Sequence, residues 1–332
     1  MNTVVLGGGG WGTAVARLLA RQGQPIWLWV RSPEREVALD SERENREYLP
    51  GVEIPRDVVI TSNLGRAAAW GNIFLFAVPS MAVRDIARQF AAVPSVRPPL
   101  AVVSLAKGIE RDTLKPMTRV LAEELPGIPV FALSGPSHAE GVGRDEPTAV
   151  VLAGQDLRLG EEIQRILMTD RFRVYLTDDV LGVEYSATMK NVIAVAAGMC
   201  DGLGYGDNAK GALVSRGLAE MVRLAVRLGC ERETLYGLSG LGDLVATCTS
   251  RHSRNRYVGE RVGRGEKITD ILAGMSMVAE GVFAAQAVRA LARAHGIEMP
   301  ITEAVYAILY EGAAPDVKLS ELMARPPKDE RR

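Results

Sequence analysis

The sequence predicts an α/β protein in which a doubly wound, mostly parallel sheet is followed by an all-α C-terminal domain. From residue 3 to about 176, short aliphatic or β-branched runs alternate with longer amphipathic segments, the pattern of a parallel sheet covered by helices. Beyond about residue 179, segments with helical spacing replace the strand-like runs. The length of 332 residues also suggests two domains, which we place at residues 1–180 and 181–332.

Short apolar runs predict the strands of the first domain. They are almost wholly apolar, as expected for strands that are buried on both faces. In chain order, the expected strands are 3–6, 26–30, 58–61, 73–78, 100–105, 130–133, 148–152 and 172–176.

Longer segments with a period near 3.6 residues predict the helices of the second domain. In chain order, the expected helices are 182–199, 208–228, 254–262, 279–295 and 302–311.

The composition argues against several classes of protein. With 39 Lys and Arg against 40 Asp and Glu, the net charge of -1 argues against a nucleic-acid partner. The three cysteines are widely spaced without a C-x-x-C pair, so we expect a reducing compartment and neither a disulfide framework nor a thiolate zinc site. The three histidines form no H-E-x-x-H motif, and we expect no metal.

We expect neither a membrane span nor a secretion signal. The N-terminal residues MNTVVLGGGG contain no basic region ahead of an apolar stretch, and no run approaches the roughly 18 apolar residues of a spanning helix. These features predict a cytoplasmic protein.

A glycine-rich turn follows the first expected strand. Gly7, Gly9 and Gly12 form G-x-G-x-x-G at the start of a helical segment, the arrangement that binds a dinucleotide in a Rossmann-type fold. Gly7 would allow the tight turn, Gly9 the approach of a pyrophosphate and Gly12 the packing of helix on strand. A turn without a ligand is the alternative, but the strand, spacing and helix together favour dinucleotide binding.

Arg31 follows the second expected strand, where an NAD-binding protein usually carries an acidic residue for the ribose hydroxyls. A cation there would attract a 2′-phosphate, so NADPH matches better than NADH, which stays possible. The alternative is a solvated charge at the strand end.

Two further strand ends carry polar groups. Because the carboxyl ends of parallel strands face the ligand crevice, Lys107 after the fifth expected strand is placed to reach an anion. Gly135 and Ser137 follow the sixth and could supply donors there. A surface lysine and a Gly-Pro turn that binds nothing are equally reasonable interpretations.

The second domain contains two further candidates. Lys190 shares a helical stripe with Ala194, Ala197 and Asp201, and small neighbours would leave room for a ligand, although a salt-bridged lysine is as good an interpretation. Asp243 lies in a glycine-rich turn.

Ser253 predicts the N-cap of the helix that begins at Arg254. Arg254 and Asn255 would then lie in the first turn, where the backbone N–H groups and the guanidinium together suit a phosphate.

The chain resembles the bacterial-type NAD(P)-dependent glycerol-3-phosphate dehydrogenases along nearly its whole length. The resemblance rests on GGGGWGTA from residue 7, YLPG at 48–51, FAVPS at 76–80, AKG, SGPSHA, MKNVI, GLGDL and SRNR, in that order.

The resemblance implies hydride transfer between NADPH and C2 of dihydroxyacetone phosphate, which gives sn-glycerol 3-phosphate, a glycerophospholipid precursor, in a homodimer. It implies that Lys190 transfers the proton at the C2 oxygen and that Asp243 helps to hold the lysine and the glycerol hydroxyls. The implied substrate site is Lys107, Gly135, Ser137, Lys190, Asp243, Ser253, Arg254 and Asn255. The implied cofactor site adds Gly10, Trp11, Arg31, Tyr48, Lys107, Ala139, Arg254, Val278 and Glu280 to the turn glycines.

The sequence departs from the family at two places. Gly10 stands where the family often has serine, and Tyr185 to Thr188 replace a commoner glycine pair. Two rival functions stay open: a two-domain reductase for 2-oxo acids, such as a ketopantoate reductase, and a non-catalytic NAD(P) sensor. No G-x-S-x-G or G-x-x-x-x-G-K-[ST] motif supports a serine hydrolase or a nucleoside triphosphatase.

Overall fold

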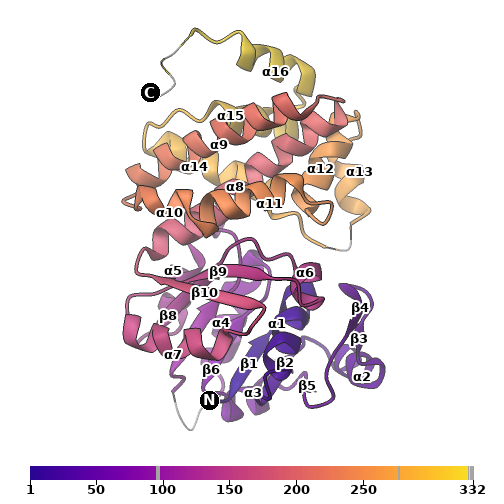
Figure 1. Ribbon diagram of the computed structural model, residues 1–332, viewed down its shortest axis with the longest axis vertical. Coiled ribbons are helices and arrows are strands. Elements are labelled where there is room, and N and C mark those ends of the chain that lie inside the picture. The colour runs from indigo at the N-terminus through magenta and orange to yellow at the C-terminus, as the bar shows by residue number, and fades with distance from the viewer. Residues whose placement is uncertain (95–97, 276, 328, 330–332) are drawn as a thin grey trace. The chain divides into compact units, whose positions relative to one another are not determined.

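The computed structural model describes residues 1–94, 98–275, 277–327 and 329 (Figure 1). The chain divides into two compact units. The first unit is Met1–Ala187 with Gly229–Asp243, and the second is Thr188–Leu228 with Leu244–Arg332. The division therefore falls a few residues after the expected boundary at 180, and a later segment returns to the first unit, which the sequence pattern did not indicate.

An eight-stranded sheet forms the centre of the first unit as described, in the order β10-β9-β8-β7-β6-β1-β2-β5 (Figure 1). All neighbouring strands are parallel except β8 and β9, which are antiparallel. This confirms the mostly parallel sheet. The bounds are β1 Thr3–Leu6, β2 Ile26–Trp29, β5 Val59–Thr61, β6 Ile73–Phe76, β7 Ala101–Ser104, β8 Val130–Ser134, β9 Thr148–Ala153 and β10 Phe172–Thr177.

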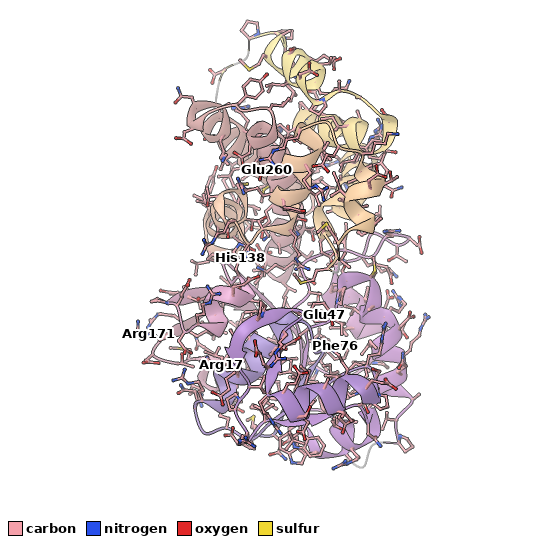
Figure 2. The ribbon with its side chains drawn as sticks, turned by 90° about the vertical axis from the view of Figure 1, so that its right-hand side faces the viewer. Arg17, Glu47, Phe76, His138, Arg171 and Glu260 are labelled. Atoms are coloured by element: carbon pink, nitrogen blue, oxygen red, sulfur yellow. The ribbon has the colours of Figure 1, made fainter. Side chains whose placement is uncertain are left out.

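Both faces of the sheet are covered, which explains the apolar runs. Successive residues of β1 belong to different cores. Val4 lies in the same buried cluster as Phe76, which is labelled in Figure 2, and Val5 lies in the cluster of Leu28 on the other face. Since side chains alternate between the faces of a strand, a strand covered on both sides must be apolar at every position.

Helices surround this sheet, as the alternating pattern predicts. They are α1 Gly10–Ala20, α2 Pro33–Glu42, α3 Leu64–Trp70, α4 Val83–Ala91, α5 Met117–Glu124, α6 Ala139–Gly143 and α7 Leu157–Leu167, with the 3-10 turn η1 at Ser80–Ala82. Later in the chain, α10 Arg232–Tyr236 and the π-helix η2 Leu238–Gly242 return to the first unit.

A short hairpin lies outside the main sheet. Strands β3 (Glu44–Asn45) and β4 (Leu49–Glu53) pair antiparallel, and Leu49 and Val52 are buried. The sequence analysis missed this hairpin because β3 has only two residues and β4 contains a proline and a glycine, so neither shows a strand pattern.

The second unit is helical in its described residues, and each expected helix lies within an observed one to within about three residues. The helices are α8 Val180–Gly202 and α11 Asp243–Thr249, which both begin in the first unit, and α9 Asp207–Arg227, α12 Arg254–Gly263, α13 Ile268–Ala273, α14 Glu280–Ala294, α15 Pro300–Glu311 and α16 Pro315–Met323. None of these described helices has the length and hydrophobicity that crossing a bilayer requires.

Glycines bring the helices of the second unit into backbone contact. A Cβ on Gly259 of α12 would lie 1.9 Å from the Val195 carbonyl oxygen of α8, and one on Gly281 of α14 would lie 2.5 Å from the Asn191 oxygen. Ala194 and Ala197 are both 0% exposed. This corrects the expectation that small residues beside Lys190 leave open space, because here they are buried among packed helices.

We expect Gly259→Ala to destabilise the protein by about 3 kcal/mol or more, since a methyl group at 1.9 Å from a backbone oxygen forces α12 away from α8. The matched control is Gly211→Ala in α9, where nothing lies within 4 Å of the added Cβ and about 0.5 to 1 kcal/mol of stabilisation is expected. Urea unfolding measures both changes. Equal stability of the two variants would contradict the packing described.

Two buried carboxylates hold helix N-termini. Glu184 accepts hydrogen bonds from the backbone N–H and the hydroxyl of Thr118 at the start of α5. Glu220 accepts from Ile301 N at 2.7 Å and Thr302 N at 3.3 Å at the start of α15. Burial raises the pKa of each carboxyl group to about 7, although the hydrogen bonds oppose the shift. The folded protein therefore binds these protons more tightly than the unfolded chain does.

For Glu220, a folded pKa above the unfolded value means that its protonation stabilises the fold below about pH 4.5 and that this contribution is lost as pH rises to about 7. Glu220→Gln cannot titrate. The free energy of unfolding of the wild type, measured relative to Glu220→Gln, should fall by about 2 kcal/mol between pH 5 and pH 8. Denaturant titrations at the two pH values test this, and a pH-independent difference would contradict it.

Candidate active site

The three turn glycines occupy structurally different positions. Gly7 has φ +125°, and a Cβ there would lie 2.7 Å from the Ala77 carbonyl oxygen. A Cβ on Gly12 would lie 1.9 Å from the Gly7 oxygen, whereas one on Gly9 would meet nothing within 4 Å. The fold itself therefore requires the first and third glycines, and the middle one borders open space.

This open space suits the pyrophosphate of a dinucleotide. Gly9 caps α1 without a side-chain hydrogen bond, so the first-turn N–H groups, including those of Gly10 and Trp11, face it without an intrahelical acceptor. The Nε1 atom of Trp11 is buried and has no hydrogen-bond partner among the described residues. Unmet donors at a helix N-terminus fit an anionic ligand.

The structure brings together three positions that the resemblance assigns to the cofactor. A Cβ on Gly10 would lie 2.5 Å from the carbonyl oxygen of Tyr48 and 3.6 Å from the Cβ of Ala139, the first residue of α6. The backbone of Tyr48 therefore fills the space that a serine at position 10 would need. Glycine at position 10 therefore allows the hairpin to lie close to the start of α1.

Arg31 is exposed after β2, one residue before Ser32, which caps α2. A hydrogen bond with Glu47 and burial raise the pKa of the Tyr48 hydroxyl, while the charges of Arg35 and Arg31 oppose this rise. Two guanidinium groups thus act on one tyrosine, and Arg35 stacks over its ring at 4.8 Å from the centroid. Arg35 was not among the residues that the sequence indicated.

Lys107 is held at the strand ends of the first unit. Its Nζ donates to the Gly135 carbonyl oxygen at 2.7 Å and to Asp243 Oδ2 at 2.9 Å. Ser137 Oγ donates to the same Gly135 oxygen at 3.1 Å. The side chains of Lys107 and Asp243 are 20% and 2% exposed. The structure therefore joins the four residues of this unit that were predicted for the substrate site in one hydrogen-bonded cluster.

The glycine-rich segment before Asp243 is a π-helix, η2. A Cβ on Gly240 would lie 2.0 Å from the Leu235 carbonyl oxygen, so only glycine fits there without movement. π-helical turns are rare and are frequent at functional sites. This one ends at Gly242, directly before Asp243 at the start of α11.

Lys190 is buried in α8, with 4% exposure. Its Nζ donates to Thr247 Oγ1 at 2.7 Å. The sequence analysis missed Thr247, although its spacing of four residues from Asp243 on one helix is a usable signal.

The start of α12 carries the other predicted group. Ser253 Oγ accepts from Arg256 N at 3.2 Å, which confirms the expected N-cap, and Arg254 is exposed in the first turn. Asn255 donates to Asn191 Oδ1 at 2.8 Å and accepts from Gly281 N at 2.8 Å.

The bond from Gly281 joins the start of α14 to the start of α12. It therefore brings Glu280, the first residue of α14, near Asn255, with Val278 two residues before it. Asn191, next to Lys190, was also missed.

The fold and these groups define a two-domain nicotinamide-dinucleotide oxidoreductase. The family described as NAD-dependent glycerol-3-phosphate dehydrogenase matches residues 2–159 with its N-terminal part and 179–320 with its C-terminal part. The chain belongs to this family.

Individual relatives agree with this assignment along their whole length. Glycerol-3-phosphate dehydrogenase [NAD(P)+] of Chlorobium limicola is 49% identical over 99% of both chains. The corresponding protein 2 of Salinibacter ruber is 48% identical over 99% of this chain and 96% of its own. The crystal structure of glycerol-3-phosphate dehydrogenase from Coxiella burnetii superposes with a TM-score of 0.93 at 37% identity, covering 98% of this chain and 99% of that one.

Thr247→Val keeps the shape of the side chain but removes the acceptor for Lys190 Nζ. We expect kcat for ketone reduction to fall by roughly tenfold to a hundredfold, with little change in cofactor affinity, because the buried amine loses one of the groups that orient it. The control is Thr249→Val on the same helix, whose hydroxyl bonds only to the Val245 carbonyl among the interactions described. Steady-state kinetics test this, and equal kcat values for the two variants would contradict it.

Proposed function

We propose that the protein transfers hydride reversibly between NAD(P)H and C2 of dihydroxyacetone phosphate, with sn-glycerol 3-phosphate as the reduced product. The observation that supports this most strongly is the 49% identity, over 99% of both chains, with a relative named for this activity. The product is the backbone of glycerophospholipids, so a role in lipid synthesis follows.

The bound dinucleotide supplies the hydride. The first-turn N–H groups of α1 and the open space at Gly9 hold its pyrophosphate, with Trp11, Tyr48 and Ala139 lining the same turn. Lys107 and Arg254 serve both cofactor and substrate, and Val278 and Glu280 complete the cofactor site.

Lys190 is the proton donor in the direction of reduction. As the C2 carbonyl of the ketone gains a hydride at carbon, its oxygen becomes an alkoxide, and Nζ of Lys190 delivers the proton that makes it a hydroxyl. Oxidation runs the same path in reverse. Thr247 accepts a hydrogen bond from this amine and fixes its direction.

Each unit contributes residues that we propose bind the substrate. Arg254, Asn255 and Ser253 at the start of α12 bind its phosphate, where a guanidinium adds to the positive end of a ten-residue helix. Asp243, oriented by Lys107, accepts from the glycerol hydroxyls, and Gly135 and Ser137 complete the polar wall. The phosphate thus supplies binding energy that positions C2 for reaction.

NADPH is the preferred cofactor in this proposal, and NADH is the weaker one. The position after β2 carries Arg31 in place of a carboxylate, and a cation there favours a 2′-phosphate.

We also propose that the protein works in the cytoplasm, because its three cysteines are buried and form no disulfide in the structure described, as expected in a reducing compartment. A homodimer is proposed from the family resemblance alone.

The test is the oxidation of NADPH and of NADH, followed by absorbance, with dihydroxyacetone phosphate and with 2-oxo acids. Turnover should require the phosphorylated ketone and be faster at low NADPH than at low NADH. Lys190→Ala should lose at least about a thousandfold in kcat while still binding cofactor. Full activity of this variant would remove Lys190 from the mechanism, and turnover of 2-oxo acids alone would indicate the rival reductase.

A further inference from the structure

One buried amide in the first unit contacts both the glycine turn and a cation. Asn45, in the two-residue strand β3, is 0% exposed. Its Nδ2 donates to the Gly8 carbonyl oxygen at 3.0 Å and to Thr13 Oγ1 at 2.7 Å, and its Oδ1 accepts from Arg35 Nη2 at 2.7 Å. One amide side chain thus makes three hydrogen bonds, as donor in two and as acceptor in one, and no apolar or shorter residue could replace it.

Arg35 is the cation in this arrangement. It lies in the first turn of α2, four residues after Arg31, and its side chain is 27% exposed. Its Nη1 donates at 2.8 Å to Oε2 of Glu47, the residue labelled in Figure 2. Its guanidinium lies 4.8 Å from the centre of the Tyr48 ring. Asn45, Glu47 and Tyr48 therefore fix the plane of this guanidinium from one short hairpin.

The location matters because the end of the second strand is where such folds bind the adenosine ribose. A guanidinium has five donors, and the described bonds to Asn45 and Glu47 use two of them. A phosphate dianion is bound most strongly by arginine that is already oriented, since less conformational entropy is lost.

We propose that Arg35 is a second 2′-phosphate-binding cation beside Arg31, and that Asn45 is the positioning residue that holds both Arg35 and the glycine turn. This inference rests on the proposed use of NADP(H). One buried amide then sets two properties at once: the affinity for the pyrophosphate, which NADPH and NADH share, and the preference for the phosphorylated cofactor.

Equilibrium titration with NADPH and NADH, followed by protein fluorescence, distinguishes the role of Asn45 Nδ2 at the glycine turn from the role of its Oδ1 at Arg35. Arg35→Met should weaken NADPH about tenfold and leave NADH within about twofold. Asn45→Ala should weaken both, and NADPH by about tenfold more than NADH. Adding Arg35→Met to Asn45→Ala should not change the ratio of NADPH to NADH affinity further, because without Asn45 the Arg35 side chain is no longer held in place.

Asn45→Asp is the matched variant. It keeps an oxygen facing Arg35 but places a second oxygen where Nδ2 lay, 3.0 Å from the Gly8 oxygen. It should weaken both cofactors by a similar factor and keep the NADPH to NADH ratio of the wild type.

The inference is wrong if Arg35→Met lowers the affinity for NADPH and for NADH by the same factor, or lowers neither. It is also wrong if the double variant loses preference for NADPH by the product of the two single losses. Since Arg35 is partly exposed, its variant should fold and decides the question even if Asn45→Ala does not. The titrations require no substrate. If the protein turns over dihydroxyacetone phosphate but Arg35→Met leaves the ratio of NADPH to NADH affinity unchanged, this inference alone is overturned. If that ratio changes but the protein does not turn over dihydroxyacetone phosphate, only the proposed reaction is overturned.

Discussion

The close approach of α1 to the end of β1 is the constraint on which the first unit depends. With Gly12 packed against the Gly7 carbonyl, the helix can start immediately after the strand and direct its unpaired N–H groups past the sheet. The hairpin then closes on this turn through Asn45 and the Tyr48 carbonyl. A larger residue at Gly12 would displace the helix start, and the anion-binding donors would lose their common direction.

The regular parts of the fold could be predicted because burial dictates them. A strand between two helical layers must be apolar at each position, so the strands expected at 3–6 and 73–78 agree with β1 and β6 to within two residues. The same holds for helices with an N-cap such as Ser253, where a local hydrogen bond fixes the start. Among the candidate residues, Lys107 and Asp243 were identified separately, but only the structure joins them.

The residues that were missed depend on contacts between distant segments. Asn45 acts through Gly8 and Thr13, more than thirty positions earlier, and its two-residue strand has no periodicity to detect. The antiparallel direction of β9 could not be predicted either, since Thr148–Ala153 is as apolar as the parallel strands of the sheet. Thr247 differs, because its spacing from Asp243 is regular and only its interaction with Lys190 was unforeseen.

The contact between Gly10 and the Tyr48 carbonyl has an evolutionary consequence. We therefore expect that a serine at the first position of this helix requires a hairpin that lies farther from it, so that the two positions do not vary independently. A serine grafted onto this chain without the companion loop would meet a backbone oxygen at 2.5 Å from its Cβ. Exchanges between homologues at this position are therefore epistatic, and their effect depends on which hairpin accompanies them.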